Sequence, residues 1–277
     1  MTPQLKLFCL PYAGAGAAVY RAWRRPLPPC IDLVAFDLPG RGIRHGEPPL
    51  TDWRRLIDIV VADAQPQVAE PFAIFGHSMG ALVALELAHA IRARHGRSPV
   101  WLGVSGCQAP ARRKLDLKWL TCDDEAVCEE LRALGGTPPE LLENRDLLEL
   151  LLPALRADFH LCGSYRPPQR EPLRCPMLVL GGTRDGISDP SDNLTAWSVE
   201  TLGRCDVAMI EGDHFFIHEQ VDAVLERVVA SLSSVAGAVR SLPATASSAP
   251  EQSLPDVLTE RRRAAAVPDA DRAVVVR

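Results

Sequence analysis

A serine in the first third of the chain lies where an apolar run meets a helical pattern. The run at 71–75 leads into Gly-His-Ser-Met-Gly at 76–80, and the helical pattern continues to Gly96. Small residues two positions before and after the serine let a strand and a helix approach closely. The pattern is typical of a nucleophilic Ser78 at a sheet edge, with the backbone N–H of Met79 at a helix N-terminus, where it stabilises an oxyanion.

A serine hydroxyl becomes an effective nucleophile when a base takes its proton and a carboxylate orients that base. Asp185 follows an apolar run at 175–180, and His214 follows another at 206–210. Loops at the carboxyl ends of parallel strands gather at one sheet edge, so both side chains are expected to meet Ser78 there. We therefore predict that Ser78, His214 and Asp185 form a catalytic triad that hydrolyses an acyl bond.

Other acids and histidines compete for these roles. The alternative acids are Asp189, Asp192 and Asp213. His77 is expected to point away from Ser78, and only His214 and His218 follow the last strand. These two have i, i+4 spacing, but neither the glutamate of a His-Glu-x-x-His motif nor a third ligand accompanies them. No metal site is predicted.

The eight cysteines are spread along the chain without a Cys-x-x-Cys pair. Their spacing predicts neither a zinc site nor a disulfide framework. We expect reduced packing residues, with Cys9 and Cys107 in the core and no cysteine in catalysis.

The loop after the apolar run 5–10 is rich in small residues. Gly14-Ala15-Gly16 lacks the third glycine of a dinucleotide fingerprint, and no Lys-Ser/Thr pair follows, so a phosphate site is not predicted. In a hydrolase sheet this loop supplies the second oxyanion N–H, which makes Ala13 the candidate. Further on, Arg41 and Arg44 are expected in a solvated loop rather than against an anionic substrate.

Apolar runs and helical patterns alternate along the chain. Strands are predicted at 5–10, 31–38, 71–75, 100–105, 175–180 and 206–210, and helices at 51–65, 81–96 and 219–232. Strands that alternate with helices predict an α/β fold with a mostly parallel central sheet flanked by helices.

The segment 107–171 interrupts this alternation. It carries helical patterns at 123–134, 139–142 and 145–162, divided by a Gly-Gly-Thr-Pro-Pro break. We expect a helical lid inserted over the active edge of the sheet. The apolar side of the longest pattern is expected to pack mainly in the core and, as a group, to form a roof. It comprises Leu147, Leu148, Leu151, Leu152, Leu155 and Phe159.

The composition limits the number of domains and the classes of partner that the chain can bind. The chain has 277 residues, 47% of them hydrophobic, with a net charge of −5 and a pI near 5.8. These values fit one globular domain, predicted at 1–235, and give no basic face for nucleic acid. Since neither a signal-type segment nor an apolar run of about eighteen residues is present, we expect a cytoplasmic protein without membrane contact. The Ala-, Ser- and Pro-rich segment 236–277 is predicted to be a disordered tail.

The motifs together resemble a known family, the type II thioesterases of polyketide and nonribosomal peptide biosynthesis. The resemblance runs through about residues 4–233 in unbroken order. It is carried by LFCLPYAG at 7–14, LPGRG at 38–42, GHSMGA at 76–81, LGGTPP at 134–139, LPALRAD at 152–158 and GDHFF at 212–216.

The resemblance implies an α/β-hydrolase fold and hydrolysis of stalled or aberrant acyl or peptidyl thioesters. The substrate would be carried on the phosphopantetheine arm of a transient partner, an acyl or peptidyl carrier protein, and the monomeric enzyme would need no cofactor of its own. By position, the nucleophile falls on Ser78, the acid on Asp185 and the base on His214. Gly186-Ile187 stands where the family usually has proline, so Asp189 stays open as the acid.

Two other functions remain as alternatives. The first is a general carboxylesterase or acyltransferase on the same sheet. The second is a hydrolase-shaped binding protein without catalysis, although such proteins usually lose a triad member and all three positions are filled here.

Overall fold

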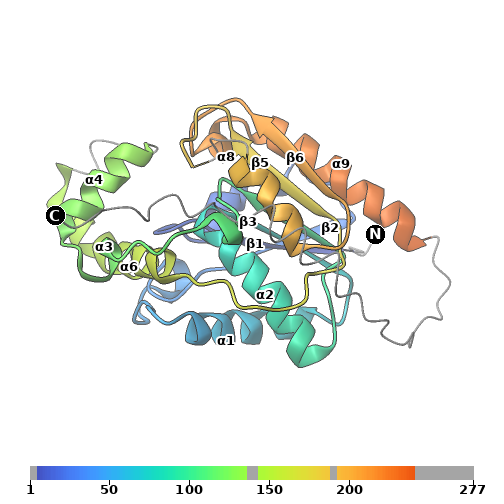
Figure 1. Ribbon diagram of the computed structural model, residues 1–277, viewed down its shortest axis with the longest axis horizontal. Helices are drawn as coiled ribbons and strands as arrows, with labels where there is room; N and C mark the ends of the chain where they lie inside the picture. The colour runs from blue at the N-terminus through green and yellow to red at the C-terminus, as the bar shows by residue number, and fades with distance from the viewer. Residues whose placement is uncertain (1–4, 136–142, 188–191, 241–277) are drawn as a thin grey trace, which may run out of the picture.

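Six parallel strands form the centre of the protein. The structure, a computed structural model, describes residues 5–135, 143–187 and 192–240. The strands follow the order β2-β1-β3-β4-β5-β6, and every neighbouring pair is parallel. They are β1 (Leu5–Leu10), β2 (Ile31–Ala35), β3 (Phe72–His77), β4 (Trp101–Ser105), β5 (Met177–Gly182) and β6 (Cys205–Ile210). The predicted class, a mostly parallel sheet flanked by helices, is confirmed (Figure 1).

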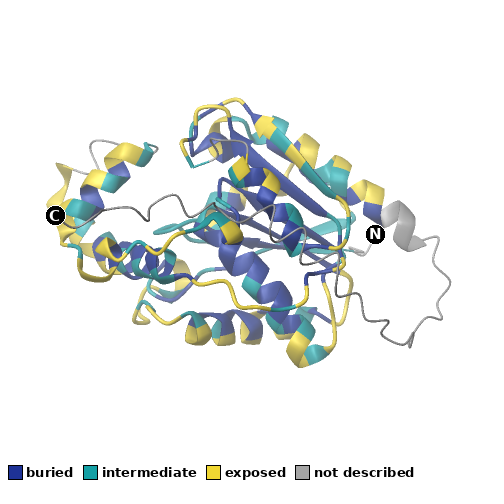
Figure 2. Cartoon of the chain, in the orientation of Figure 1, coloured by how far each residue is buried: buried dark blue, intermediate teal, exposed yellow. Residues whose placement is uncertain are grey.

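Helices cover both faces of the sheet. On one face lie α1 (Trp53–Ala64) and α2 (Met79–His95), and on the other lie η1 (Ala17–Arg24) and α9 (Val221–Arg240). Each face has its own apolar core, and the strands and inner helix faces are dark blue in Figure 2. Strands β3, β4 and β5 are buried along their whole length, which is why their sequences read as continuous apolar runs.

Local signals in the sequence set the ends of the helices. The Asp52 carboxylate accepts the Arg55 N–H at 2.8 Å and caps the start of α1. Gly96 ends α2 in the left-handed conformation, with φ of +62°.

The lid lies at one end of the sheet and consists of α3 (Lys118–Thr121), α4 (Asp124–Leu134) and α6 (Arg145–Ser164). The third apolar cluster of the protein joins these helices, with Trp119 of α3 stacked on Phe159 of α6 at 4.7 Å between ring centroids. The shorter elements are η2 (Gly42–Arg44), η3 (Gln65–Gln67), η4 (Pro110–Arg112), α7 (Asp192–Thr195), η5 (Ala196–Glu200) and α8 (Phe216–Glu219). The predicted helical pattern at 139–142 lies outside the described residues.

Two predicted boundaries differ from the structure by more than two residues. The strand predicted at 31–38 ends at Ala35, because the Asp37 carboxylate accepts the N–H groups of Ala17 and Ile43 and turns the chain away from the sheet. The last helix was predicted to end at residue 232 but runs to Arg240, five residues into the segment assigned to the tail. The rest of that segment, 241–277, lies outside the described residues.

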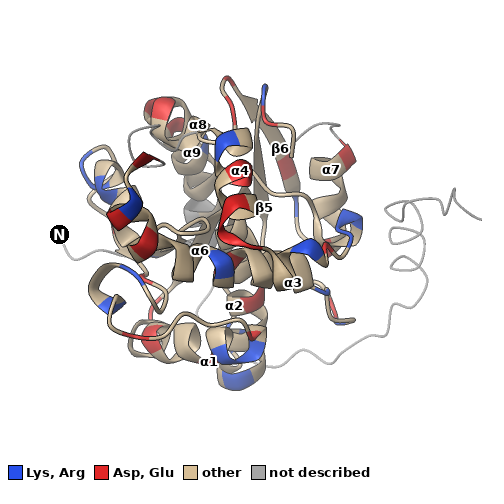
Figure 3. Cartoon of the chain, turned by 90° about the vertical axis from the view of Figure 1, so that its left-hand side faces the viewer, with Lys and Arg blue, Asp and Glu red and all other residues tan. Residues whose placement is uncertain are grey.

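Charges of both signs are mixed on the outer helices, as the blue and red segments of Figure 3 show. Several of them pair, including Arg44 with Asp63, Arg94 with Asp58 and Arg156 with Asp124. Within the described ranges, every helix is too short or too polar to cross a membrane.

Candidate active site

Ser78 lies in a strained turn between β3 and α2. Its φ of 54° and ψ of −121° make it the sole non-glycine residue with positive φ in the described part of the chain. The glycines on either side permit this turn: a Cβ at Gly76 would overlap the carbonyl of Gly80, and a Cβ at Gly80 would overlap the carbonyl of Leu10. The turn therefore holds the serine hydroxyl at the carboxyl edge of the sheet.

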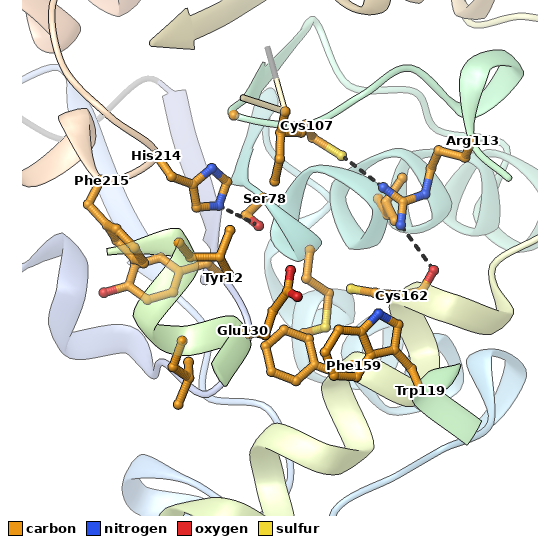
Figure 4. Close-up of a pocket in the computed structure, with 17 residues that line it drawn as sticks. Tyr12, Ser78, Cys107, Arg113, Trp119, Glu130, Phe159, Cys162, His214 and Phe215 are labelled. Carbon is orange, nitrogen blue, oxygen red and sulfur yellow. Dashed lines mark hydrogen bonds between the residues drawn. The ribbon is translucent and has the colours of Figure 1, made fainter. Parts of the chain in front are cut away.

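The structure brings together the three residues that the sequence predicted to meet. His214 Nε2 lies 3.0 Å from the Ser78 Oγ (Figure 4). On the other side of the ring, His214 Nδ1 lies 3.1 Å from the Asp185 Oδ2. The carboxylate also accepts the Ile187 N–H at 3.0 Å through its other oxygen. With Nδ1–H donated to Asp185, Nε2 faces the serine as an acceptor, the arrangement needed to take the hydroxyl proton.

The alternative acids do not occupy this position. The Asp213 carboxylate accepts the Phe215 N–H at 2.7 Å and closes the turn that carries His214. Asp192 begins α7 and is exposed. Asp189 lies outside the described residues.

His77 supports the loop that carries His214. It is fully buried, its Nε2–H donates to the His214 carbonyl at 2.9 Å, and its Nδ1 lies 2.9 Å from the Ser105 Oγ. Burial, and then the charge on His214, hold the pKa of His77 well below its ordinary value. A neutral His77 thus joins β3, β4 and the histidine loop, and it points away from Ser78 as predicted.

The predicted oxyanion donors, Ala13 and Met79, line the same pocket as Ser78 and His214. The loop after β1 is closed by the Ala15 N–H, which donates to the Tyr12 carbonyl at 3.1 Å. Among the described residues no acceptor faces the N–H of Ala13 or of Met79. Their role toward an oxyanion stays a prediction.

The pocket beside Ser78 is small and mainly apolar, with a volume of about 150 Å³. The lid contributes Trp119, Leu131 and Phe159 to its wall. Trp119 and Phe159 are labelled in Figure 4. Of the six lid residues predicted as core and roof, Phe159 lines the pocket, whereas Leu147 is 43% exposed.

Two cysteines and an arginine form another part of the wall. Arg113 donates to the Cys162 carbonyl at 3.0 Å and lies 4.0 Å from the Cys107 Sγ. Burial raises the pKa of Cys107 to about 11 and that of Cys162 to about 12. Both are therefore protonated thiols at neutral pH. Sequence reasoning placed Cys107 in the core but missed that it also lines the pocket.

The expectation of a solvated loop was wrong for Arg41. This side chain is 7% exposed and forms a two-point ion pair with Asp158 of α6, which is 1% exposed. Asp158 lies three residues after Leu155 on the buried side of the helix, which indicates a buried acid but does not name its partner. Arg44 pairs instead with Glu47 at 2.7 Å and with Asp63 at 2.5 Å.

No cluster of three or more metal-ligating side chains occurs in the ranges that the structure describes. His214 and His218 face different partners. His218 Nε2 lies 2.9 Å from the Tyr12 hydroxyl, whereas His214 faces Ser78.

Comparison with known proteins places this geometry in context. The chain matches the family described as "Thioesterase domain" over residues 5–232. It is 42% identical over 224 residues to the gramicidin S biosynthesis protein GrsT of Aneurinibacillus migulanus, covering 80% of this chain and 87% of that protein. It is 36% identical over 217 residues to the thioesterase PikA5 of Streptomyces venezuelae, covering 78% and 76%.

Solved structures agree with the sequence matches. The type II thioesterase BorB from the borrelidin biosynthetic cluster superposes with a TM-score of 0.75 at 34% identity, covering 84% of this chain and 95% of that one. ClbQ from the colibactin pathway gives a TM-score of 0.79 at 31% identity, covering 85% and 99%. The predicted resemblance and the α/β-hydrolase fold are thereby confirmed.

Proposed function

Because the chain belongs to the thioesterase domain family, we propose that it is a type II thioesterase of polyketide or nonribosomal peptide biosynthesis. It hydrolyses stalled or aberrant acyl groups from the phosphopantetheine arm of carrier proteins. The observation that carries the proposal is the hydrogen-bonded chain from Ser78 through His214 to Asp185 beneath a helical lid.

The geometry suits a two-step acyl transfer to water. His214 takes the Ser78 proton while Oγ attacks the thioester carbonyl carbon, and the N–H groups of Met79 and Ala13 hold the resulting oxyanion. The C–S bond breaks as His214 returns the proton to the thiolate of the arm. Water, deprotonated by His214, then attacks the acyl-serine and releases the carboxylic acid and free Ser78. Each oxyanion donor in such sites contributes about 3 to 4 kcal/mol.

The pocket volume indicates a short acyl group. A cavity of about 150 Å³ holds a molecule of about six carbon atoms. The stacked Trp119 and Phe159 limit the pocket on the lid side. We propose that short, mainly apolar acyl groups are released, with the arm reaching in past the lid from the carrier protein.

The test uses one carrier protein loaded with several acyl groups. Wild type should release acid from the shortest groups fastest, whereas Ser78→Ala should release none above the uncatalysed rate. Ser234→Ala is the matched control, because that exposed hydroxyl bonds only within its own helix. Equal release by wild type and Ser78→Ala would refute the proposal.

Two further measurements separate the alternatives. A fluorophosphonate probe should label wild type and Ser234→Ala but not Ser78→Ala, and a wild-type protein that resists labelling would be a binding protein. A general carboxylesterase would cleave a simple oxygen ester as fast as the carrier-bound thioester of the same acyl group. We expect the thioester to be preferred.

A further inference from the structure

A buried carboxylate connects the lid to the loop that carries Ala13. Asp158 lies on α6 and accepts the Gly14 N–H at 2.7 Å through Oδ2. Arg41 donates to both of its oxygens, at 2.8 Å to Oδ1 and more closely to Oδ2, and also to the Pro39 carbonyl at 3.2 Å. Three segments far apart in the sequence therefore meet at one side chain.

Gly14 is held tightly at this junction. Its φ is +75°, and a Cβ there would overlap the side chain of Leu155, which lies one turn before Asp158 on α6. On the other side of the loop, the Ala15 N–H donates to the Tyr12 carbonyl at 3.1 Å. That carbonyl and the Ala13 N–H belong to the same planar peptide group, so the two hydrogen bonds fix the direction of the Ala13 N–H.

A neutral oxygen could accept the Gly14 N–H equally well, so this hydrogen bond alone does not explain why the acceptor is a charged carboxylate paired with Arg41. A carboxylate this deeply buried requires a compensating cation and further hydrogen bonds. The guanidinium of Arg41 supplies two of these bonds in a planar fork and thereby fixes the orientation of the carboxylate as well as its charge.

We propose that Asp158 is a positioning residue for the oxyanion hole: from the lid helix α6, its carboxylate, oriented by Arg41, sets the place of the Ala13 N–H. This inference rests on the proposed function, since it assumes that Ser78 attacks a carbonyl group. The helix α6 then has two roles: it closes the pocket with Phe159, and it holds the loop that carries Ala13 with Asp158. The helix must be docked for the chemical step to run at full rate.

The experiment compares two double variants that remove the ion pair together. Arg41→Met with Asp158→Asn keeps an oxygen acceptor for the Gly14 N–H, whereas Arg41→Met with Asp158→Leu removes it. Arg41→Met with Asp158→Leu replaces the buried pair by apolar side chains of similar size, a change that often leaves stability unchanged, and Asp158→Asn keeps the size of the original side chain. Hydrolysis of a short acyl thioester of N-acetylcysteamine gives kcat and KM, and thermal unfolding checks the fold.

We expect the Leu variant to lose about 10- to 100-fold in kcat with KM within about twofold of wild type, because a misplaced donor costs binding only in the transition state. The Asn variant should recover most of the loss. Inhibition by an acyl trifluoromethyl ketone, whose adduct with Ser78 carries an oxyanion, should weaken in the Leu variant by the same factor as kcat. If the ion pair were merely structural, its loss would lower the unfolding temperature but would leave kcat and the affinity for the trifluoromethyl ketone as in wild type.

Wild-type kcat in the folded Leu variant would overturn the inference, as would equal losses in the Asn and Leu variants. If the Leu variant does not fold, Asp158→Glu keeps both charges and displaces the carboxylate by one methylene. It should lower kcat at constant KM, and full kcat in that variant would overturn the inference. The proposed function fails on different evidence, namely a wild-type protein no faster than Ser78→Ala.

Discussion

At the scale of single residues, the sequence left more than one aspartate as a candidate for the acid that orients His214. Asp185 accepts from His214 and from the Ile187 N–H, whereas Asp192 is exposed at the start of α7. We expect Asp185→Asn to lower kcat by about 10⁴, because the amide no longer fixes the tautomer of His214. Steady-state hydrolysis of an acyl thioester gives the comparison.

Asp192→Asn and Asp189→Asn are the controls for that change. Both should keep kcat within a small factor of wild type. A loss in Asp189→Asn as large as that in Asp185→Asn would move the role of the acid to residue 189.

Two buried histidines predict how stability depends on pH. Burial, with the positive charges of Arg170 and Arg92, lowers the pKa of His89 to about 2 from 6.5, and burial holds the pKa of His77 well below the same value. Both are neutral in the folded protein but bind protons in the unfolded chain below about pH 6.5. The free energy of unfolding should be unaffected by them above pH 6.5 and fall by about 1.4 kcal/mol per pH unit for each histidine below it.

Urea unfolding between pH 5 and 8 measures that slope. His89→Gln removes one of the two titrating groups far from Ser78, so its stability should fall less steeply than that of wild type over the same range. An identical slope in both proteins would contradict the assignment for His89.

The pocket thiols should resist alkylation. Since the pKa of Cys107 is raised to about 11 and that of Cys162 to about 12 by burial, on the order of one molecule in a thousand or fewer carries either thiolate at pH 8. We expect iodoacetamide to leave activity unchanged in the native protein and, in urea, to modify all eight cysteines. Loss of activity with an adduct mapped to residue 107 or 162 would contradict this.

Sequence patterns predicted which residues meet at the candidate site better than they predicted the residues that support it. Ser78, Asp185 and His214 each follow directly after an apolar run, so the strand pattern placed them at one edge. Arg41 and Asp158 are separated by 117 positions and meet only because α6 docks against the loop after β1. No local pattern encodes such a contact, and an arginine beside glycines is typical of a solvated loop.

At the scale of elements, the crossing of β1, β3 and α2 depends on backbone contact. A Cβ at Gly80 would overlap the Leu10 carbonyl, with the Pro11 carbonyl 2.7 Å away. We expect Gly80→Ala to lower the free energy of unfolding by about 3 kcal/mol or more, because backbone atoms on both sides must move apart. Urea denaturation provides the measurement.

Gly46→Ala is the matched control for this change. A Cβ at Gly46 meets no atom within 4 Å, so the substitution should leave stability within about 0.5 kcal/mol of wild type. Similar losses in both variants would show that the crossing is looser than the structure indicates.

The elements themselves were largely predictable, because each sheet strand is a mainly apolar run and α1, α2 and α4 each have a cap or a breaker at one end; α9, which runs past its predicted end, is the exception. Asp52, Gly96 and Asp123 mark helix ends in the sequence and do so in the structure. The arrangement of the lid was not predictable, since the sequence gives its helical periodicity but not which leucine faces the pocket.

At the scale of the whole molecule, the strand order explains why the site lies where it does. The order reverses between β1 and β3, and their following loops carry Ala13 and Ser78. Ligand sites in open parallel sheets form at such a reversal, where neighbouring loops turn to opposite faces and leave a crevice.

The domain boundary gives a prediction at this scale. The apolar core that α9 shares with the sheet includes Val235, and α9 itself ends at Arg240. We propose that a chain ending at Arg240 keeps the unfolding temperature and kcat of the full chain. Thermal unfolding and thioester hydrolysis by the two proteins test this, and a marked loss of either would assign a role to 241–277.

Because α6 both lines the pocket and holds the loop that carries Ala13, it affects how this fold can acquire a new acyl specificity. Substitutions on that helix alter pocket shape and transition-state stabilisation at once, so variants selected there for a different acyl group are expected to be slow. Wall positions contributed by α3 and α4, such as Trp119 and Leu131, make no hydrogen bond or ion pair to the loop at Ala13 among the described residues, although Ala13 packs against the same apolar cluster. We therefore expect changes of acyl specificity, whether by natural drift or by directed evolution, to be tolerated best at wall positions on α3 and α4.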